Sequence, residues 1–378
     1  MRSRRISIPR LAGLAVLALS LLLLQITIAH AADSQIGGFV YVMTNQDSGN
    51  SVVVYKRAAN GALHRAQEVS TQGLGSGGTQ DPLASQGALI LSSDGKLLFA
   101  VNAGSNEISV LGTSGRGLKF LSKANSGGDF PVSVAVHKDF VYVLNAHGTP
   151  NISGFALDPN GMLHAILNSI LPLAGGPDSA PAQVGFSQDG DMLVVTETAT
   201  NLLDVFLVSN DGHAAGPVSQ PSSGITPFGF SFGHLGRLFV SEAAAGAEGA
   251  ATASSYQFND ANMLQPISAV VPDTQTAACW MVLTNTGRFA FTSNTGSGTI
   301  SSYSVAPDGK LTLAEAVAGR TGDYTFPIDM AMSRDSKFLY VVNSAIGGVS
   351  IFEVNGGKLS SRGNFTGLPL SIQGIAAQ

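Results

Sequence analysis

The sequence is poor in cysteine, in tryptophan and in charged side chains. One cysteine, Cys279, among 378 residues excludes an internal disulfide framework and a zinc site built from several cysteines. Charged residues make up only 12% of the chain, and the net charge is −5. An acidic chain without a basic stripe does not suit the phosphate backbone, so we expect no nucleic-acid partner.

Long apolar runs are also scarce, and the run that stands out lies near the N-terminus. Four arginines within the first ten residues precede the apolar stretch 11–24, which is too short to span a bilayer comfortably. Ala29-His30-Ala31 then matches a small-x-small cleavage site. The pattern predicts a signal peptide over 1–31 and a periplasmic or secreted protein, with Sec and twin-arginine export both open. An uncleaved N-terminal anchor is the alternative.

Removal of residues 1–31 takes away four arginines and no acid, so the net charge moves from −5 to −9. No other apolar run approaches the length of a membrane span. We therefore expect no membrane span in the mature chain, residues 32–378.

Glycine, in contrast, is abundant: the chain has 45, without the fixed period of collagen. Many of them punctuate a repeat whose best-preserved copy is 91–102. An apolar run, an Asp94-Gly95 turn, an alternating strand and a polar residue at the strand end follow one another there, as in a β-meander.

The second strand and its polar end residue recur seven times, at spacings of 43 to 57 residues. The end residues, called stop residues below, are Asn45, Asn102, Asn145, Glu197, Glu242, Asn294 and Asn343. Seven four-stranded units of this size predict an all-β fold, a seven-bladed β-propeller. The first unit lacks its innermost strand, and the segment 370–376 is left over, so we expect the C-terminal strand to complete the first blade. Two separate β-sandwiches are the alternative, but no linker divides the chain, and one domain over 32–378 is predicted.

In this fold the stop residues and the loops between blades share one face, here called the top face. Glu197 and Glu242 interrupt a series of asparagines in consecutive blades, and a pair of carboxylates can act as general acid and base. They are predicted as catalytic residues; alternatively they bind Ca²⁺ or Mg²⁺, or only end their strands. No other cofactor is expected. The five asparagines are candidate substrate-binding residues, or they bond their own turns.

Three further residues are candidates for substrate binding on the top face. His147 follows Asn145, Gln183 opens an inner strand, and Trp280 can offer a stacking platform or belong to the core. Basic residues mostly fall at the opposite, bottom turns, namely Lys96, Lys138, Arg237, Arg288, Arg334 and Lys337. A phosphorylated substrate on the top face would lack its usual cationic partners.

The repeat, with its Asp-Gly-x-Leu-Leu-Phe-Ala-Val-Asn core and Gly-x-Leu outer strands, resembles the lactonase family of seven-bladed propellers over residues 38–378. That family includes the propeller-type 6-phosphogluconolactonases and the fungal 3-carboxy-cis,cis-muconate lactonising enzymes. The resemblance implies a lactone-directed activity with His, Arg and Glu in the site. In this chain Pro131, Pro181 and Pro327 are followed by Val132, Ala182 and Ile328, where the family has His or Arg, and only Glu197 matches.

Two functions therefore remain open from the sequence. The first is an exported lactonase-like protein that acts on an unphosphorylated small lactone or sugar acid, with Glu197 assisted by Glu242. The second is a non-catalytic propeller that binds a ligand or a protein partner through its top face.

Overall fold

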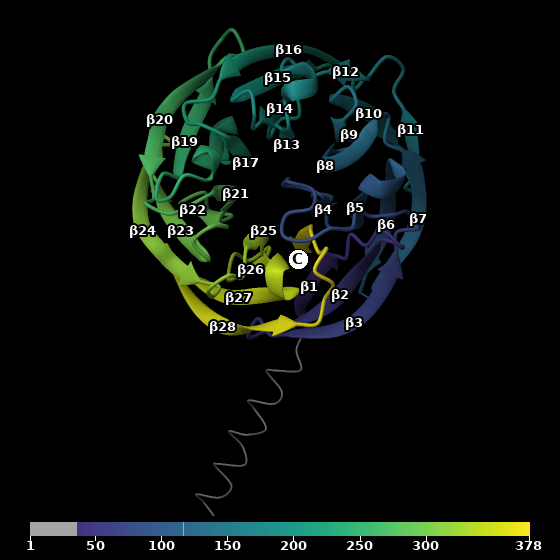
Figure 1. Ribbon diagram of the computed structural model, residues 1–378. Helices are drawn as coiled ribbons and strands as arrows, with labels where there is room; N and C mark the ends of the chain where they lie inside the picture. Colours follow the sequence, from purple (N-terminus) through teal and green to yellow (C-terminus); the bar gives the residue numbers. More distant parts are fainter. Residues whose placement is uncertain (1–35, 116) are drawn as a thin grey trace, which may run out of the picture.

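The chain forms a closed ring of seven antiparallel sheets, as the computed structural model shows (Figure 1). The structure describes residues 36–115 and 117–378, so the predicted signal segment 1–31 lies outside the described residues. Each sheet is one blade, and its strands follow one another from the axis outward. The predicted seven-bladed propeller is confirmed.

The blades take their strands from the chain in sequence order, apart from the strand that closes the ring. Blade one contains β1 (Ile36–Met43), β2 (Ser51–Ala58) and β3 (Leu63–Ser70), and blade two β4 (Leu89–Leu91), β5 (Leu97–Asn102), β6 (Glu107–Ser114) and β7 (Gly117–Asn125). Blade three contains β8 (Asp129–His137), β9 (Phe140–His147), β10 (Asn151–Leu157), β11 (Leu163–Ala165) and β12 (Leu171–Pro172), and blade four β13 (Pro181–Phe186), β14 (Met192–Glu197), β15 (Leu202–Val208) and β16 (Ala214–Pro221).

The remaining three blades repeat the same order. Blade five contains β17 (Pro227–Phe232), β18 (Leu238–Glu242), β19 (Thr252–Phe258) and β20 (Leu264–Pro272), and blade six β21 (Ala278–Leu283), β22 (Phe289–Asn294), β23 (Thr299–Val305) and β24 (Leu311–Arg320). Blade seven contains β25 (Pro327–Met332), β26 (Phe338–Asn343), β27 (Gly348–Asn355) and β28 (Lys358–Thr366). Short 3₁₀ helices interrupt the loops: η1 (Ala103–Ser105), η2 (Gly176–Asp178), η3 (His234–Gly236), η4 (Ala244–Gly246) and η5 (Ser344–Ile346). None of the helices between residues 36 and 378 that the structure describes reaches the length and hydropathy of a membrane span.

The C-terminal strand closes the ring, as the leftover segment predicts. β29 (Ile375–Ala377) pairs antiparallel with β1, with Tyr41 opposite Ala376, and so becomes the inner strand of blade one. The last residue extends the closure, because the amide of Gln378 donates to the carbonyl of Phe39 at 2.8 Å. The two ends of the described chain therefore share one sheet.

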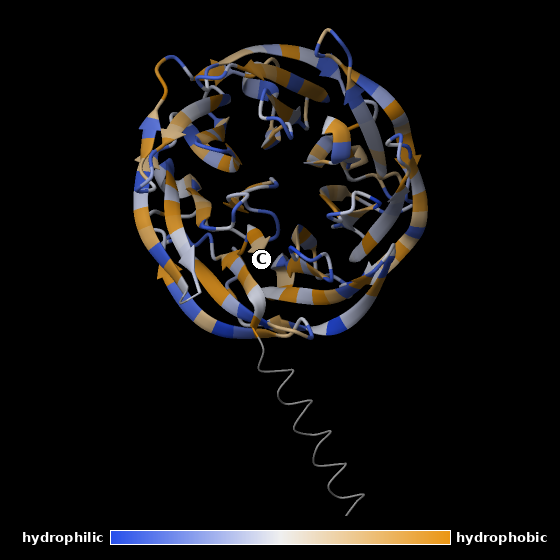
Figure 2. Ribbon diagram, turned by 180° about the vertical axis from the view of Figure 1, so that it is seen from behind, coloured by the Kyte–Doolittle hydropathy of each residue, from blue (hydrophilic) through white to orange (hydrophobic). Residues whose placement is uncertain are grey.

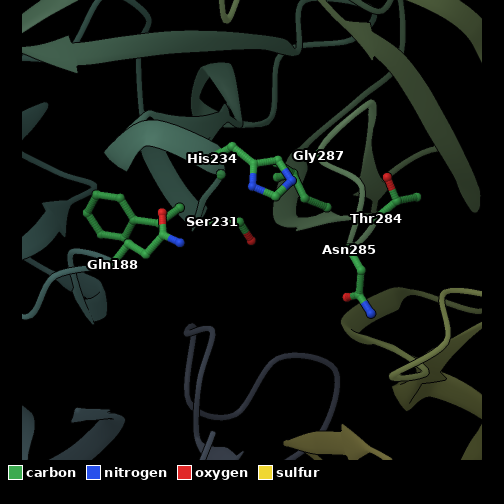
Figure 3. A pocket seen from close by; sticks show the side chains of 9 residues that line it. Gln188, Ser231, His234, Thr284, Asn285 and Gly287 are labelled. Carbon is green, nitrogen blue, oxygen red and sulfur yellow. The ribbon is translucent and has the colours of Figure 1, made fainter. Parts of the chain in front are cut away.

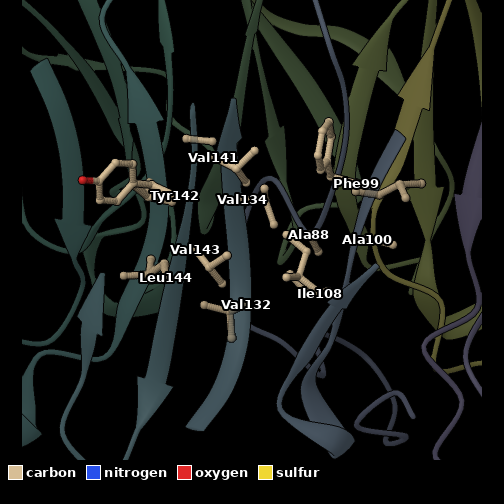
Figure 4. Packing of buried hydrophobic residues seen from close by; sticks show 14 of the residues in the cluster. Ala88, Phe99, Ala100, Ile108, Val132, Val134, Val141, Tyr142, Val143 and Leu144 are labelled. Atoms are coloured by element: carbon tan, nitrogen blue, oxygen red, sulfur yellow. The ribbon is translucent and has the colours of Figure 1, made fainter. Parts of the chain in front are cut away.

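The hydrophobic core lies between neighbouring blades rather than inside any one of them. Second strands are apolar on both faces and buried, because a blade lies on each side of them; β5 is an example. Figure 4 shows Val132, Val134 and Val141 of blade three packed against Phe99 and Ile108 of blade two. The outermost strands face solvent, and in Figure 2 apolar and polar residues alternate along them. Burial of apolar area between blades, worth about 25 cal/mol per Å², stabilises the ring.

Candidate functional site at the channel mouth

The seven predicted stop residues do not line an open channel. Each of them has a fully buried side chain. They lie at or just beyond the ends of the second strands, as the repeat predicts, but their polar groups point into the joints between strands and loops.

The asparagines among them connect the second strand of a blade to its third strand. Asn102 shows the pattern, because its Nδ2 donates to Ser109 Oγ at 2.8 Å. Its Oδ1 accepts from Thr71 Oγ1 at 2.6 Å and from Asn50 Nδ2 at 3.0 Å, both in blade one. Three other asparagines donate to a serine at the same place of β10, β23 and β27: Asn145 to Ser153, Asn294 to Ser301 and Asn343 to Ser350. Asn45 instead bonds the loop that follows blade one, through Ser76.

Glu197 occupies the same joint in blade four. Its Oε1 accepts from the amide of Gly175 at 3.0 Å, and its Oε2 accepts from Thr200 Oγ1. Asp204 replaces the serine of the other blades, and its carboxyl accepts from the amide of Ala174 at 2.9 Å and from Ser219 Oγ. Burial raises the pKa of Glu197 to about 7, and the Asp204 carboxyl contributes to the increase, against the hydrogen bonds from Thr200 and Gly175.

Glu242 is held separately in blade five. Its Oε1 accepts from the amide of Gly224 at 2.9 Å, and its Oε2 from Thr252 Oγ1 at 2.5 Å. Burial raises the pKa of this carboxyl as well. Each glutamate thus has protein donors on both oxygens, one of them in the loop that enters its blade. Among the residues that the structure describes, no group of three His, Cys, Asp or Glu could hold a metal ion.

The mouth of the channel on the top face is formed where the inner strands begin. A residue with positive φ lies at the start of the inner strand in all seven blades: Gly374, Gly87, Phe130, Ala180, Thr226, Ala277 and Phe326. In six blades it comes just before the strand, and in blade three it is the second residue of β8. In five blades a bulge follows at once, which turns one or two residues out of the strand register. The bulges include Val132, Ala182, Phe228, Cys279 and Ile328, all buried.

These bulges contain the positions at which the resemblance to the lactonase family implies histidine and arginine. Val132, Ala182 and Ile328 are fully buried there. Apolar side chains can neither transfer a proton nor bind a carboxylate. The departure noticed in the sequence therefore removes the histidine and arginine chemistry of the family from these three positions.

A segment of the chain, residues 81–87, fills this mouth; we call it the plug. The repeat predicts that the loops between blades lie on the top face, but in the structure the second half of the loop between blades one and two enters the channel. Figure 1 shows it as the blue-violet loop beside β4, inside the ring. Because these residues turn toward the axis, the inner strand of blade two, β4, is reduced to three residues.

Hydrogen bonds connect the plug to four other blades and to the C-terminal segment. The side-chain amide of Gln86 pairs with the backbone of Met281, at 2.9 Å to its carbonyl and 3.0 Å from its amide. The backbone amide of Gln86 donates to Ala182 at 3.1 Å, and the side chain reaches Phe230 at 3.4 Å. Ser85 Oγ donates to the carbonyl of Val132 at 2.8 Å.

A glycine of blade five makes room for the plug. A Cβ on Gly229 would come within 2.0 Å of Gln86 Oε1, and within 2.7 Å of the carbonyl oxygen of Cys279. Only glycine allows this approach.

The three other predicted binding residues have different surroundings. Trp280 is fully buried, and its indole N–H donates to the carbonyl of Ser85 at 3.0 Å, so it packs under the plug and presents no ring face to a ligand. Gln183 ties the inner strands of blades four and five together through the backbone of Phe230. His147 is exposed on the top face and stacks on Phe130, with ring centroids 4.0 Å apart.

Two acids at the mouth were not predicted from the sequence: Asp81, which is partly buried at the start of the plug, and Asp329, which is buried on β25. Gln373 Nε2 donates to Asp81 Oδ1 at 2.7 Å, and burial raises the pKa of Asp81 to about 7. Burial also raises the pKa of Asp329 to about 8, with a further increase from the charge of Asp81. Asp329 follows Pro327-Ile328 inside an apolar strand. A carboxylate in such a strand was the sequence signal that could have indicated a buried acid.

Comparisons with known proteins agree with this architecture. The family model "Lactonase, 7-bladed beta-propeller" matches residues 29–171 and 247–369. No curated protein sequence matches the chain.

Solved structures show the same fold at low sequence identity. A candidate 6-phosphogluconolactonase of Bacteroides uniformis is 18% identical, with a TM-score of 0.70, and the match covers 90% of this chain and 99% of that one. The periplasmic gluconolactonase of Pseudomonas aeruginosa is 17% identical, with a TM-score of 0.69 and coverage of 89% and 98%. A protein of Lactobacillus plantarum is 19% identical, with a TM-score of 0.68 and coverage of 88% and 96%. The family model matches well over half of the chain, and the protein belongs to the lactonase family of seven-bladed β-propellers.

Proposed function

We propose that this member of the lactonase family binds a small lactone or sugar acid without opening or closing its ring. One observation carries the proposal: the mouth positions 132, 182 and 328 are apolar and buried, and the plug is hydrogen-bonded to the backbone at 132 and 182. Lactone chemistry needs an accessible acid or base near the ring ester and a partner for the carboxylate. Neither is available at this mouth while the plug is in place.

Family membership supports a small-molecule ligand. One structural relative bears the name gluconolactonase, and another that of a candidate 6-phosphogluconolactonase. We propose an unphosphorylated ligand, because the arginines, the apolar stretch and the cleavage pattern of residues 1–31 favour export, away from the phosphorylated sugar acids of the cytoplasm.

A lactone assay tests the absence of turnover. The chain from residue 32 onward is incubated with D-glucono-1,5-lactone and its 6-phosphate, and acid release is followed by pH indicator. The Pseudomonas gluconolactonase provides the positive control for the assay with the unphosphorylated lactone. We expect release at the buffer rate, while calorimetry detects binding of the lactone or of gluconate. Hydrolysis clearly above the buffer rate would overturn the proposal.

A second candidate function, true lactonase activity, is favoured by the pKa of Glu197. A carboxyl with a pKa of about 7 is half protonated at neutral pH, as suits a general acid or base. This function requires the plug and the Thr200 hydroxyl to move aside. Under it, Glu197→Gln abolishes turnover, whereas the substitution Glu242→Gln, in the next blade, leaves turnover largely unchanged.

We also propose that the protein works outside the cytoplasm, in the periplasm or secreted. The arginines, the apolar stretch and the Ala29-His30-Ala31 site support removal of residues 1–31. Intact mass spectrometry of the protein from cell fractions tests this. The full-length mass in the membrane fraction would instead indicate an anchor.

A further inference from the structure

The bottom turn of blade five departs from the repeat. In the other blades that share this turn, a hydroxyl residue opens it and bonds a side chain two or four residues later, as Ser92 does with Asp94 at 2.7 Å and Ser187 with Asp191 at 2.8 Å. Blade five has Gly233-His234-Leu235-Gly236-Arg237 at the same place. The hydroxyl and the acid are both missing. The turn also falls in the stretch between 171 and 247 that the family model leaves unmatched.

This turn holds an unfavourable backbone conformation. Leu235 has φ 60° and ψ 30°, although it is not glycine, and its side chain is 80% exposed. A left-handed leucine costs about 1–2 kcal/mol and gains nothing from burial here. Strain of this kind at an exposed turn points to a use other than stability.

Two adjoining cavities open beside the turn. The first has a volume of about 350 Å³ and is lined by Gln188, Ser231, Phe232, His234, Leu283 and Asn285, among others (Figure 3). The second, of about 250 Å³, shares His234 with the first and adds Arg237 and Arg288. We call the two together the blade-five cavity.

His234 is held at the junction of the two cavities by a glycine. Gly287, with φ +64°, packs so closely that a Cβ would come within 2.5 Å of His234 Cδ2. The imidazole ring therefore lies on the backbone of the next blade. In Figure 3, His234 lies between Gln188 of blade four and Asn285 of blade six. Three blades thus contribute polar side chains to one space.

The charges around this cavity have one sign. Its lining includes two arginines and no Asp or Glu. The Arg237 guanidinium already donates to the carbonyl of Pro307, and it also borders a separate cavity with Asp189 and Asp191. Arg288, in contrast, makes no side-chain hydrogen bond or ion pair within residues 36–115 and 117–378, and neither do Gln188 and His234.

From this arrangement we infer that the blade-five cavity binds a hydroxylated carboxylate, such as a sugar acid. Arg288 would pair with the carboxylate, and the apolar floor of Phe232 and Leu283 would receive the carbon chain. Gln188 would bond hydroxyls, and so would the Oδ1 of Asn285, whose Nδ2 already donates to the carbonyl of Arg334. The inference rests on the proposed small-molecule binding. It places the ligand on the face opposite the closed mouth.

Titration calorimetry with D-gluconate on the chain from residue 32 onward tests the site. We expect Arg288→Ala and His234→Ala to weaken gluconate binding about tenfold or more. Arg320→Ala is the matched control, because Arg320 is an exposed arginine at the end of β24 that lines neither cavity; this variant should bind gluconate as the unchanged protein does. D-glucose, without a carboxylate, should bind at least tenfold more weakly.

Other results of these binding experiments would overturn the site, the ligand class or the proposed function. No gluconate binding, or binding insensitive to Arg288→Ala, overturns the site. Binding of inorganic phosphate in place of gluconate overturns the carboxylate class. Lactone hydrolysis that survives Arg288→Ala would refute the proposed function while leaving this site to be judged by the gluconate data alone. His234 ring resonances that shift on addition of gluconate, while those of His64 on an outer strand stay fixed, support the location.

Discussion

At the scale of single residues, the joint between second and third strands shows how one position serves both structure and acidity. An asparagine and a serine fill it in four blades, whereas blade four uses Glu197 and Asp204. A carboxyl can replace the amide in a buried joint only if it stays protonated or finds donors. Glu197 meets both conditions in part: Gly175 and Thr200 donate to it, and its pKa of about 7 keeps it partly protonated at neutral pH.

This pKa predicts how stability depends on pH. The unfolded carboxyl titrates near 4.5 and the folded one near 7, so the folded state binds more protons between these values. Stability contributed by Glu197 is complete below about pH 4.5 and is lost as the pH rises through 7. Glu197→Gln, which stays neutral, should weaken this fall in the free energy of unfolding by up to about 1.4 kcal/mol per pH unit.

Urea unfolding at pH 5, 6, 7 and 8 measures the effect. Asp81 and Asp329 contribute in the same direction, so the variant should still lose some stability as the pH rises. Glu315→Gln, an exposed change on β24, is the control and should follow the unchanged protein. Identical pH profiles for Glu197→Gln and the unchanged protein would contradict the assigned acidity.

At the scale of elements, β29 is short, but the closure of the whole ring depends on it. Three residues of pairing with β1 complete blade one. Ile375 is buried between the first and last blades, whereas Leu370, a few residues earlier, is about half exposed. The same substitution should therefore destabilise the protein strongly at Ile375 and hardly at all at Leu370.

Ile375→Asp should destabilise the protein by roughly 4 kcal/mol or more, because it buries an unpaired charge in the closing strand. Leu370→Asp should change stability by less than about 0.5 kcal/mol. Thermal unfolding followed by circular dichroism measures both. Deletion of residues 371–378 should abolish soluble folding, and a soluble truncation that melts cooperatively would refute the role of β29.

At the scale of the whole molecule, the plug connects parts of the ring that are far apart in sequence. Gln86 bonds the inner strands of blades four, five and six, and Gln373 of the C-terminal segment bonds Ser85 and Asp81. Cys279, the single cysteine of the chain, is buried on the neighbouring strand β21, and the Asp81 charge adds to the increase in its pKa that burial causes. We therefore expect a thiol reagent to reach Cys279 only when the plug leaves the mouth.

Gln86→Ala should open the mouth more often. The change leaves the backbone amide and carbonyl of Met281 without their partner, at a cost of about 1–3 kcal/mol. We expect a lower melting temperature and, with a thiol reagent under native conditions, modification of Cys279 that is about tenfold faster or more. Gln265→Ala on the exposed side of β20 is the matched control. Equal rates in the two variants would show that the plug does not guard the channel.

The repeat determined how much was predictable from sequence. Strand order, blade number and ring closure follow from a pattern that recurs seven times, and they were predicted. The surroundings of Glu197, Glu242 and Trp280 were not, because the burial of a strand-end side chain depends on loops from elsewhere in the chain. The plug was missed for the same reason: nothing local in 81–87 indicates a path toward the axis, and its partners in other elements lie 47 to 292 residues away.

The closing strand also constrains how the protein can be made. The first strand of the ring has no inner partner until the last few residues have emerged from the ribosome, so blade one stays incomplete throughout synthesis. Pairing between opposite ends of a chain is the slowest kind of contact to form. A protein of this design therefore closes its ring only once β29 has been synthesised, a timing compatible with passage through a membrane before folding.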